Sequence, residues 1–373
     1  MHLTRREALA GAGGALVAGA AAQISVAEPR GEAVGRAFAG GRQPGILTQR
    51  QDHLTLAAFD LVTPDRSDLS QLLTAWTDLV VALCEGRPRG GPDTGEADGL
   101  ARSNLSVTIG FGASLFDDRY GLRDRRPPGL ERAGDSLDVG GDLLLQVCAD
   151  DRQVVFHAVH QLANAALGIA TRRWTQHGFL SRTRPGATPR NLFGFKDGTA
   201  NLAATDEAEL ARHVWVPRGG GAMTGGTYLV YRRIRMRLQA WDRATPDEQE
   251  RSIGRRKASG ARFGGRDEHA TLAVAEAPPR SHVRAMHPDA NGGVRILRRP
   301  YNYDDGSTAD GDADAGMAFI AFAADPQRQF GRLLARLERD DDLQRYLVHT
   351  GGALFAVPPA PDTGGLLGAR LLS

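Results

Sequence analysis

The sequence predicts an α+β protein made of two ferredoxin-like units, each with the order β-α-β-β-α-β and an antiparallel sheet. The main observation behind this prediction is a repeated order of strand-like and helix-like segments, which places a first unit at residues 53–205 and a second at 206–373. The composition agrees, because 41% hydrophobic and 24% charged residues in a chain of 373 are typical of a globular protein with room for two domains.

The first unit begins with a strand at 53–62, HLTLAAFDLV. Apolar residues spaced by three and four between 69 and 83 predict the first helix. The remaining elements are strands at 105–112 (LSVTIGFG) and 142–149 (DLLLQVCA), a helix from about 152 to 167, and a closing strand at 174–182 (WTQHGFLSR).

The second unit repeats this order from the strand TYLVYRRIRMRL at 227–238. A helix follows at 245–257, where Thr245 and Glu248 have the spacing of a capping box and Pro246 takes the first helical position. Further elements are strands at 293–300 (GVRILRRP) and 316–324 (GMAFIAFAA), a helix opened by Asp325-Pro326, and a final strand at 351–359 (GGALFAVPP).

The N-terminal segment predicts export. Residues 1–27 have Thr4-Arg5-Arg6 before a Gly/Ala-rich stretch, and Ser25 and Ala27 provide small residues for signal peptidase, so a twin-arginine signal peptide is expected. A short membrane anchor is the alternative, disfavoured by the many small residues, and no stable membrane insertion is expected. Residues 28–52 read as an extended arm, and the mature protein is expected to be periplasmic or extracellular.

Charge and cysteine usage exclude some classes of function. The formal net charge is +2 and no long basic run is present, so no nucleic-acid partner is expected. The two cysteines, Cys84 and Cys148, lie in apolar runs and are expected to be buried free thiols, with one disulfide as the alternative.

The segment NLFGFKDGTANL at 191–202 contains Lys196, one of only two lysines in the chain. An Asp-Gly pair is common in ordinary turns. Here, however, Phe193 and Phe195 alternate around Gly194, so the turn is expected to lie against apolar material. A carboxylate such as that of Asp197 can act in such a place as a general acid or base.

Two further residues stand out. His282 lies in the long segment 259–293, which holds three of the ten histidines and is longer than ordinary connections. One histidine cannot form a zinc site, but haem needs only one axial nitrogen. Arg298 is expected on one strand face with Val294 and Ile296, an unusual place for a charge.

Four segments in this order, NLFGFKDGTANL, SHVRAMHP, ILRRPYNY and VHTGGALFAVPP, resemble the dye-decolourising (DyP-type) peroxidase family of haem enzymes. The resemblance covers about residues 50–360. It implies two ferredoxin-like domains, one haem b per chain between helices and sheets, and reduction of hydrogen peroxide with oxidation of dyes, phenols or other organic reductants. The export signal points to the secreted, twin-arginine-exported branch.

The resemblance also implies roles for individual residues. His282 matches the proximal iron ligand, and Asp197 and Arg298 match the distal pair. Residues expected around the haem are Gly198, Thr199 and Ala200 over its edge, His287, Pro288 and Asp289 near a propionate, and Met317 and Phe319 over the distal face. The chain departs from the family pattern at Pro300, where Gly is common, and at Met317, where Leu is more usual.

These roles carry chemical expectations. Asp197 would move the peroxide proton from the inner to the outer oxygen, and because the ordinary pKa of aspartate is ~3.9, an acidic pH optimum is expected. Arg298 would stabilise developing negative charge. His282 would need a carboxylate on its second ring nitrogen, for which Asp341 and Asp342 are candidates.

Other interpretations stay open at this stage. Lys196 fits a propionate contact, a structural salt bridge or a plain surface charge, and Tyr346 fits an electron relay or a packed aromatic. The alternatives to a peroxidase are a haem-handling protein of iron uptake that releases iron, a non-catalytic haem carrier, and an exported domain without cofactor. The sequence leaves the oligomeric state and the physiological reductant open.

Overall fold

The structure is a computed structural model that describes residues 41–86, 93, 95–130, 137–181, 187–362 and 365–372. The predicted signal peptide at 1–27 and residues 28–40 of the predicted arm lie outside the described residues. Among the helices that are described, none is both long and apolar enough to cross a membrane.

The first half of the chain contains the predicted elements. They are β1 (His53–Leu61), α2 (Arg66–Cys84), β2 (Ser106–Gly112), β3 (Leu143–Ala149), α3 (Arg152–Ala165) and β4 (Ala170–Phe179). Four short 3-10 turns follow β2: Ala113–Leu115, Asp118–Tyr120, Arg123–Arg125 and Pro128–Leu130. The strands are antiparallel in the order β2-β3-β1-β4.

The second half has strands near the positions predicted at 227–238, 316–324 and 351–359, and it adds short helices and an unpredicted strand, β7. Its main elements are α4 (Glu207–His213), β5 (Thr227–Met236), α5 (Leu238–Arg243), α6 (Pro246–Ile253), α7 (His282–Ala285), β6 (Leu297–Arg298), β7 (Tyr301–Ser307), β8 (Ala313–Ala323), α8 (Arg332–Asp340), β9 (Leu347–Val357) and α9 (Ala369–Leu372). The 3-10 turns are Gly221–Met223, Val274–Glu276, Pro288–Asn291 and Asp342–Tyr346, and a π-helical turn, Gln327–Gly331, precedes α8. The predicted capping box is confirmed, because Thr245 Oγ1 accepts from the Glu248 amide and Glu248 accepts from the Thr245 amide.

The strand predicted at 293–300 is wrong in extent. Only Leu297–Arg298 form a strand, β6, and the chain passes Pro300 before it enters β7 at Tyr301. Proline lacks an amide hydrogen and cannot donate to a strand ladder, which explains the break. Arg298 is therefore held at the end of a two-residue strand, where it pairs with Ala321 of β8.

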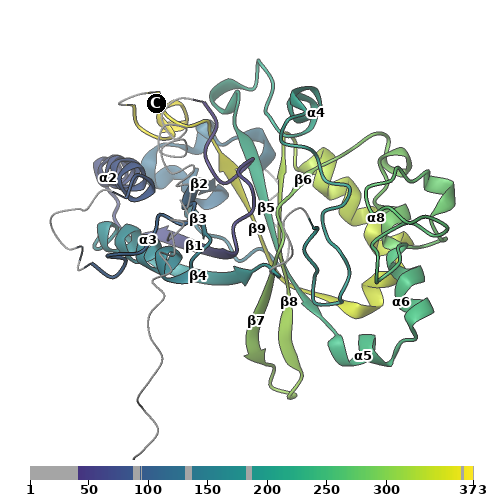
Figure 1. Cartoon of the computed structure of the whole chain (residues 1–373). Helices are drawn as coiled ribbons and strands as arrows, with labels where there is room; N and C mark the ends of the chain where they lie inside the picture. The colour runs from purple at the N-terminus through teal and green to yellow at the C-terminus, as the bar shows by residue number, and fades with distance from the viewer. Residues whose placement is uncertain are drawn as a thin grey trace, which may run out of the picture.

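The α+β class and the antiparallel strands are confirmed, but the two halves share one sheet (Figure 1). In the described part of the chain eight strands close in the order β5-β9-β2-β3-β1-β4-β7-β8, with β8 pairing back to β5 and β6 added to β8. The halves meet where Phe111 of β2 pairs with Ala356 of β9 and where Phe179 of β4 pairs with Asn302 of β7. Closure of this kind removes exposed strand edges.

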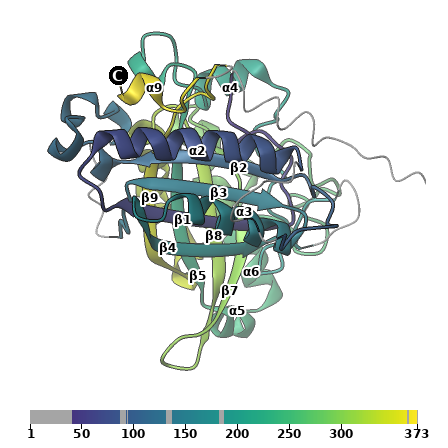
Figure 2. The same cartoon turned by 90° about the vertical axis from the view of Figure 1, so that its left-hand side faces the viewer.

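Alternation along the strands separates two cores. Leu54, Leu56 and Ala58 of β1 point into the closed sheet, where they pack with residues of β3, β5, β8 and β9. Phe59 and Leu61 point outward to the core beneath α2 and α3, and Figure 2 shows these two helices lying across the outer face of the first-half strands. Helices α5, α6 and α8 lie on the opposite side of the molecule, beside the second-half strands (Figure 1).

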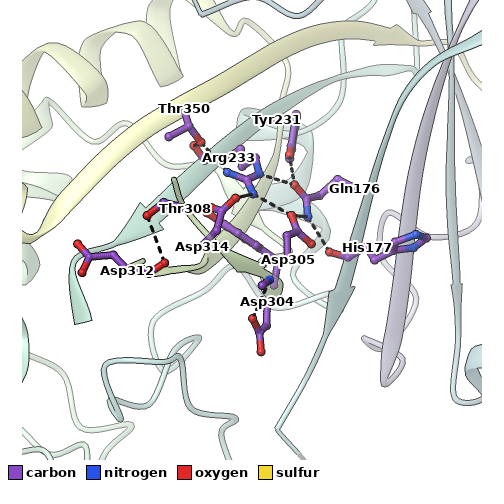
Figure 3. Close-up of polar contacts among 12 residues, drawn as sticks. Gln176, His177, Tyr231, Arg233, Asp304, Asp305, Thr308, Asp312, Asp314 and Thr350 are labelled. Carbon is purple, nitrogen blue, oxygen red and sulfur yellow. Dashed lines mark hydrogen bonds and ion pairs between the residues drawn. The ribbon is translucent and has the colours of Figure 1, made fainter. Parts of the chain in front are cut away.

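One end of the closed sheet is crossed by a polar network centred on Arg233 of β5 (Figure 3). Its guanidinium donates to Asp305 at 2.8 Å, Asp314 at 2.9 Å, Gln176 Oε1 at 3.0 Å and Thr350 Oγ1 at 3.0 Å. These partners lie on β7, β8, β4 and β9. The network therefore joins strands from both halves.

Both cysteines are buried and free, as predicted. Cys84 belongs to the core beneath α2, whereas Cys148 lies inside the closed sheet. Burial raises the pKa of the Cys84 thiol to about 12, which makes it unreactive at neutral pH.

Candidate active site

The NLFGF stretch is a tight turn built on Asn191. The Asn191 side chain accepts hydrogen bonds from the amides of Phe193 (3.1 Å) and Phe195 (3.2 Å), and Gly194 adopts φ +81°. Both phenylalanines are 2% exposed and contact the buried Trp241, whose ring centroid lies 4.3 Å from that of Phe193. The expectation that this turn lies against apolar material is confirmed.

Lys196 forms a structural salt bridge. Its ammonium pairs with Glu268, and both side chains are largely buried, at 19% and 12% exposure. Burial acts to raise the pKa of Glu268, but the hydrogen bond and charge of Lys196 outweigh it, so this pKa lies below its ordinary value. The pair joins the turn to the long segment 259–293.

The distal pair predicted from sequence is brought together. Arg298 Nη1 lies 3.3 Å from Asp197 Oδ1, and the two side chains are 29% and 15% exposed. Asp197 follows the tight turn, and its amide donates to Pro189 O at 2.8 Å. The next residue, Gly198, has φ +125°, which disfavours a side chain there, and Thr199 and Ala200 continue the chain at increasing exposure.

His282 meets a buried carboxylate. It starts α7, and its Nδ1 lies 2.7 Å from Asp341 Oδ2, a carboxylate that is 0% exposed. Asp342, the other candidate, instead pairs with the exposed Arg280 at 2.7 Å. An ionised carboxylate accepts a hydrogen bond from Nδ1–H, which keeps the proton on Nδ1 and leaves the lone pair on Nε2. The second ring nitrogen has no hydrogen bond within the described residues and can serve as a metal ligand.

The C-terminal end of α6 lies near both His282 and Arg298. A Cβ on Gly254, which has φ +95°, would lie 2.9 Å from Oγ of Ser281, the residue before His282. The next residue, Arg255, is buried, and its pKa is lowered first by burial and then by the positive charge of Arg298. The predicted proximal and distal residues therefore border the same helix end.

The outer face of β8 supplies apolar side chains. Met317 and Phe319 alternate with Ala318 and Ile320, which are fully buried in the closed sheet, so the first two point to the opposite face. Phe319 lies 6.1 Å from the ring of Phe330. A pocket of about 190 Å³ on this side of the sheet is lined by Val230, Arg232, Phe330, Leu334 and neighbouring residues.

Met317 also lines a much smaller cavity with Asp197. This cavity measures about 10 Å³, at the lower limit of what can hold one water molecule, and Arg50, Asn191 and Asn302 contribute polar groups to it. A water-sized molecule can therefore lie beside the Asp197 carboxylate.

The residues predicted near a propionate have local structural contacts. His287 Nε2 donates to Leu272 O at 2.8 Å and its Nδ1 accepts from the Asp289 amide at 3.2 Å, so both ring nitrogens are used within the segment. Pro288 begins the 3-10 turn that follows, and the Asp289 side chain is 73% exposed.

Tyr346 is a packed aromatic residue in this structure. It is 8% exposed and its ring lies edge-on to Trp241 at 4.9 Å, in the core that also contains Phe193 and Phe195. The guanidinium of Arg345 lies over the Tyr346 ring, 4.8 Å from its centroid.

Two residues that hold the distal pair were missed by sequence reasoning. Asn201 Nδ2 donates to Arg298 O at 2.7 Å, and its Oδ1 accepts from the Arg298 amide at 2.9 Å. Arg50 donates to Pro300 O at 3.0 Å and to Asp197 O at 3.3 Å. Arg50 has no local sequence signal, because its partners lie more than one hundred residues away along the chain.

Comparison with known families gives two matches that together span most of the chain. Residues 43–180 match the N-terminal model of the Dyp-type peroxidases, and residues 188–362 match their C-terminal model. Among curated relatives, a deferrochelatase of Escherichia coli O157:H7 is 35% identical over 367 residues, covering 90% of this chain and 86% of that protein.

Solved structures with the same fold include ferric DtpA from Streptomyces lividans, at 39% identity and a TM-score of 0.85, covering 90% of this chain and 96% of that one. A DyP-type peroxidase from Cellulomonas bogoriensis is 36% identical with a TM-score of 0.82, covering 90% and 97% of the two chains.

Proposed function

The chain belongs to the Dyp-type peroxidase family, and from this premise we propose that it is a haem-dependent peroxidase that reduces hydrogen peroxide and oxidises dyes, phenols or other organic reductants. The observation that carries the proposal is the Asp197–Arg298 pair, at 3.3 Å, beside a cavity of water-molecule size. A carboxylate and a fixed guanidinium are the groups that proton transfer and charge stabilisation require.

The side chains present fit one haem b per chain. His282 offers Nε2 as an axial ligand because Asp341 engages Nδ1 at 2.7 Å. Met317, Phe319 and Phe330 provide apolar surface on the outer side of β8, against which a flat aromatic macrocycle can lie. In support, the relative DtpA from Streptomyces lividans, at 38–39% identity, has been solved as an oxyferrous complex and in the ferric form, and it therefore holds iron.

Bound haem would supply the redox centre and the two electrons that cleavage of the peroxide O–O bond requires. Asp197 takes the proton from the inner peroxide oxygen and returns it to the outer oxygen, which leaves as water. Arg298 stabilises the negative charge that develops as the bond breaks. Asp341 keeps the proton on Nδ1 of His282 and fixes the orientation of the imidazole. An acidic pH optimum follows from a carboxylate base.

The direct test replaces Asp197 with Ala. We expect peroxidase turnover to fall by about 10²–10⁴, the usual contribution of a general acid–base group, while haem binding stays intact. Asp312→Asn, at an exposed aspartate between β7 and β8, is the control and should change neither property. Full turnover in Asp197→Ala would refute the assigned mechanism.

A second candidate function is iron release from haem, because the curated relatives at 35% identity are named deferrochelatase. A chelatase of this kind would leave free porphyrin, whose fluorescence appears under reducing conditions without peroxide. We expect none from this chain. A non-catalytic carrier is disfavoured because haem binding alone has no use for the Asp197–Arg298 pair.

Export and internal organisation are further parts of the proposal. Thr4-Arg5-Arg6 and the small residues before position 28 support export by the twin-arginine pathway to the periplasm or beyond, and hence the secreted branch of the family. The strand orders β2-β3-β1-β4 and β7-β8-β5-β9 support two ferredoxin-like units, here joined edge to edge.

A further inference from the structure

The arm that precedes β1 touches the segments that carry the distal pair. Arg50 Nη1 donates to Pro300 O at 3.0 Å, and Nη2 donates to Asp197 O at 3.3 Å. One guanidinium thus ties the residue after the Arg298-Arg299 pair to the backbone of Asp197. The two segments are otherwise joined through Asn201 and the Asp197–Arg298 contact itself.

The same arm is held from the opposite direction by Arg299. This buried guanidinium donates to the carbonyl oxygens of Thr48 and Gln49 and to Oε1 of Gln51. Arg50 and Arg299 therefore donate in opposite directions across one contact, which fixes residues 48–51 against residues 298–300. Farther along the arm, Gln43 bonds Ile109 and Pro358, so the arm is anchored independently of Arg50.

We propose that Arg50 is a positioning residue for Asp197, so that the N-terminal arm completes the distal side of the site; this rests on the proposed peroxidase function. Arg50 acts through the carbonyl oxygens of Asp197 and Pro300 and does not itself exchange the proton. Its fork of donors is suited to this task, since a planar guanidinium can reach two acceptors at once and an ammonium is a single point charge.

The position of Arg50 also bears on Gly198 and on the small cavity. A Cβ at Gly198 would lie 3.3 Å from Arg50 Nη2, so the guanidinium occupies the space that a side chain there would need. Arg50 lines the water-sized cavity together with Asp197 and Met317. Removing Arg50 would therefore remove the hydrogen bond to Asp197 O and enlarge the space beside the Asp197 carboxylate.

The charge of Arg50 acts within a crowded set of groups. Asp197, Arg298, Arg299 and Tyr301 all interact with it electrostatically, and burial is the main cause that lowers the pKa of Arg50. Arg50 still carries a positive charge at neutral pH, because arginine is effectively always protonated. With a neutral side chain at position 50, we expect the fall in the peroxide rate constant on the acidic side of its pH profile (the acid limb) to begin at a higher pH.

The experiment compares Arg50→Lys, Arg50→Gln and the control Arg42→Gln. Arg42 lies in the same arm, where it pairs with Glu207 at 2.8 Å and covers the Trp215 ring at 4.3 Å, and it does not contact Asp197. For each haem-loaded variant we measure haem occupancy and the rate constant of the reaction with hydrogen peroxide as a function of pH. For each haem-free variant we measure amide hydrogen exchange in residues 190–201.

We expect Arg50→Gln to slow the peroxide reaction about 100-fold, the scale of a misplaced catalytic group, and to shift its acid limb upward. Arg50→Lys should lose about 10-fold while keeping the limb in place, because it keeps the charge but not the paired hydrogen bonds. Both should speed hydrogen exchange in residues 190–201, where the Asp197 amide bonds Pro189 O at 2.8 Å. Arg42→Gln should change none of these.

Two results would overturn the inference. The first is an Arg50→Gln variant with the peroxide kinetics and the amide hydrogen exchange of the wild type. The second is an Arg42→Gln variant that loses as much peroxide reactivity as Arg50→Gln, because the loss would then reflect attachment of the arm in general. If Arg50→Gln does not fold, Arg50→Lys alone decides. If the wild-type protein ignores peroxide while exchange still separates Arg50 from Arg42 variants, the proposed function fails and the positioning role stands.

Discussion

Replacing Asp341 with Asn tests the contact that orients the proposed iron ligand. Asp341 is fully buried, accepts from the Leu343 amide at 2.9 Å through Oδ1, and faces His282 Nδ1 through Oδ2 at 2.7 Å. An asparagine can keep the bond to Leu343 with its carbonyl, but its amide nitrogen then faces Nδ1 as a donor. Nδ1 must accept, so the imidazole proton moves to Nε2, where it blocks the lone pair that binds iron.

The size of the effect follows from the bond that is lost. A hydrogen bond to a charged group contributes about 1.5–3 kcal/mol, and at 1.4 kcal/mol per tenfold change this corresponds to about 10–150-fold. Loss of a group that orients a metal ligand typically costs 10–100-fold in metal affinity, which agrees. We therefore expect Asp341→Asn to weaken haem binding by about 10–100-fold.

The assay is titration of haem into haem-free protein, followed at the Soret band, with the melting temperature as a check on folding. Asp342→Asn is the matched control, because the neighbouring carboxylate pairs with exposed Arg280 and not with His282. Equal haem affinity in wild type and Asp341→Asn, or the same loss in Asp342→Asn, would refute the orientation of His282 by Asp341.

Three further predictions concern the surrounding structure. Burial acts to raise the pKa of Glu268, but Lys196, with smaller effects of Thr188 and His269, lowers it overall in the folded state. The ionised Glu268 therefore stabilises the fold above pH 4.5, and this stabilisation is lost as the pH falls through the folded-state pKa. Glu268→Gln should therefore cost about 1 kcal/mol in a urea melt at pH 7, with the difference from wild type shrinking below pH 4.5; a constant difference would contradict the sign. Phe322→Ala, in the closed sheet at 0% exposure, should cost about 3–5 kcal/mol, whereas Phe156→Ala, at 59% exposure on α3, should cost under about 0.5 kcal/mol. Tyr346→Phe should leave both the melting temperature and dye turnover unchanged, because the ring is buried at 8% exposure against Trp241; a selective loss of dye turnover would identify an electron relay.

Local patterns in the sequence were sufficient for most elements and for part of the site. Spacing by three and four predicted α2, and capping-box spacing predicted the start of α6 at Thr245, because both signals are confined to one turn or a few turns of chain. Phe193 and Phe195 around Gly194 similarly predicted a turn against apolar material, which the Trp241 contact confirms.

Features that depend on distant partners could not be predicted. Closure of the sheet rests on pairs such as Phe111 with Ala356, and strand alternation alone does not say which strand lies alongside. Lys196 pairs with Glu268 inside the long segment, and Arg50 bonds Pro300, which lies 250 residues farther along the chain, so neither contact has a local signature. The choice between Asp341 and Asp342 likewise required the direction of the 3-10 turn that they begin.

The visible spectrum of the purified, haem-loaded protein before and after mixing with one equivalent of hydrogen peroxide tests the central claim most directly. We predict a Soret band that changes within the mixing time in the wild-type protein and far more slowly in Asp197→Ala. A Soret band that ignores peroxide would contradict the peroxidase function and favour a haem carrier, and absence of any Soret band after addition of haem would contradict the cofactor itself.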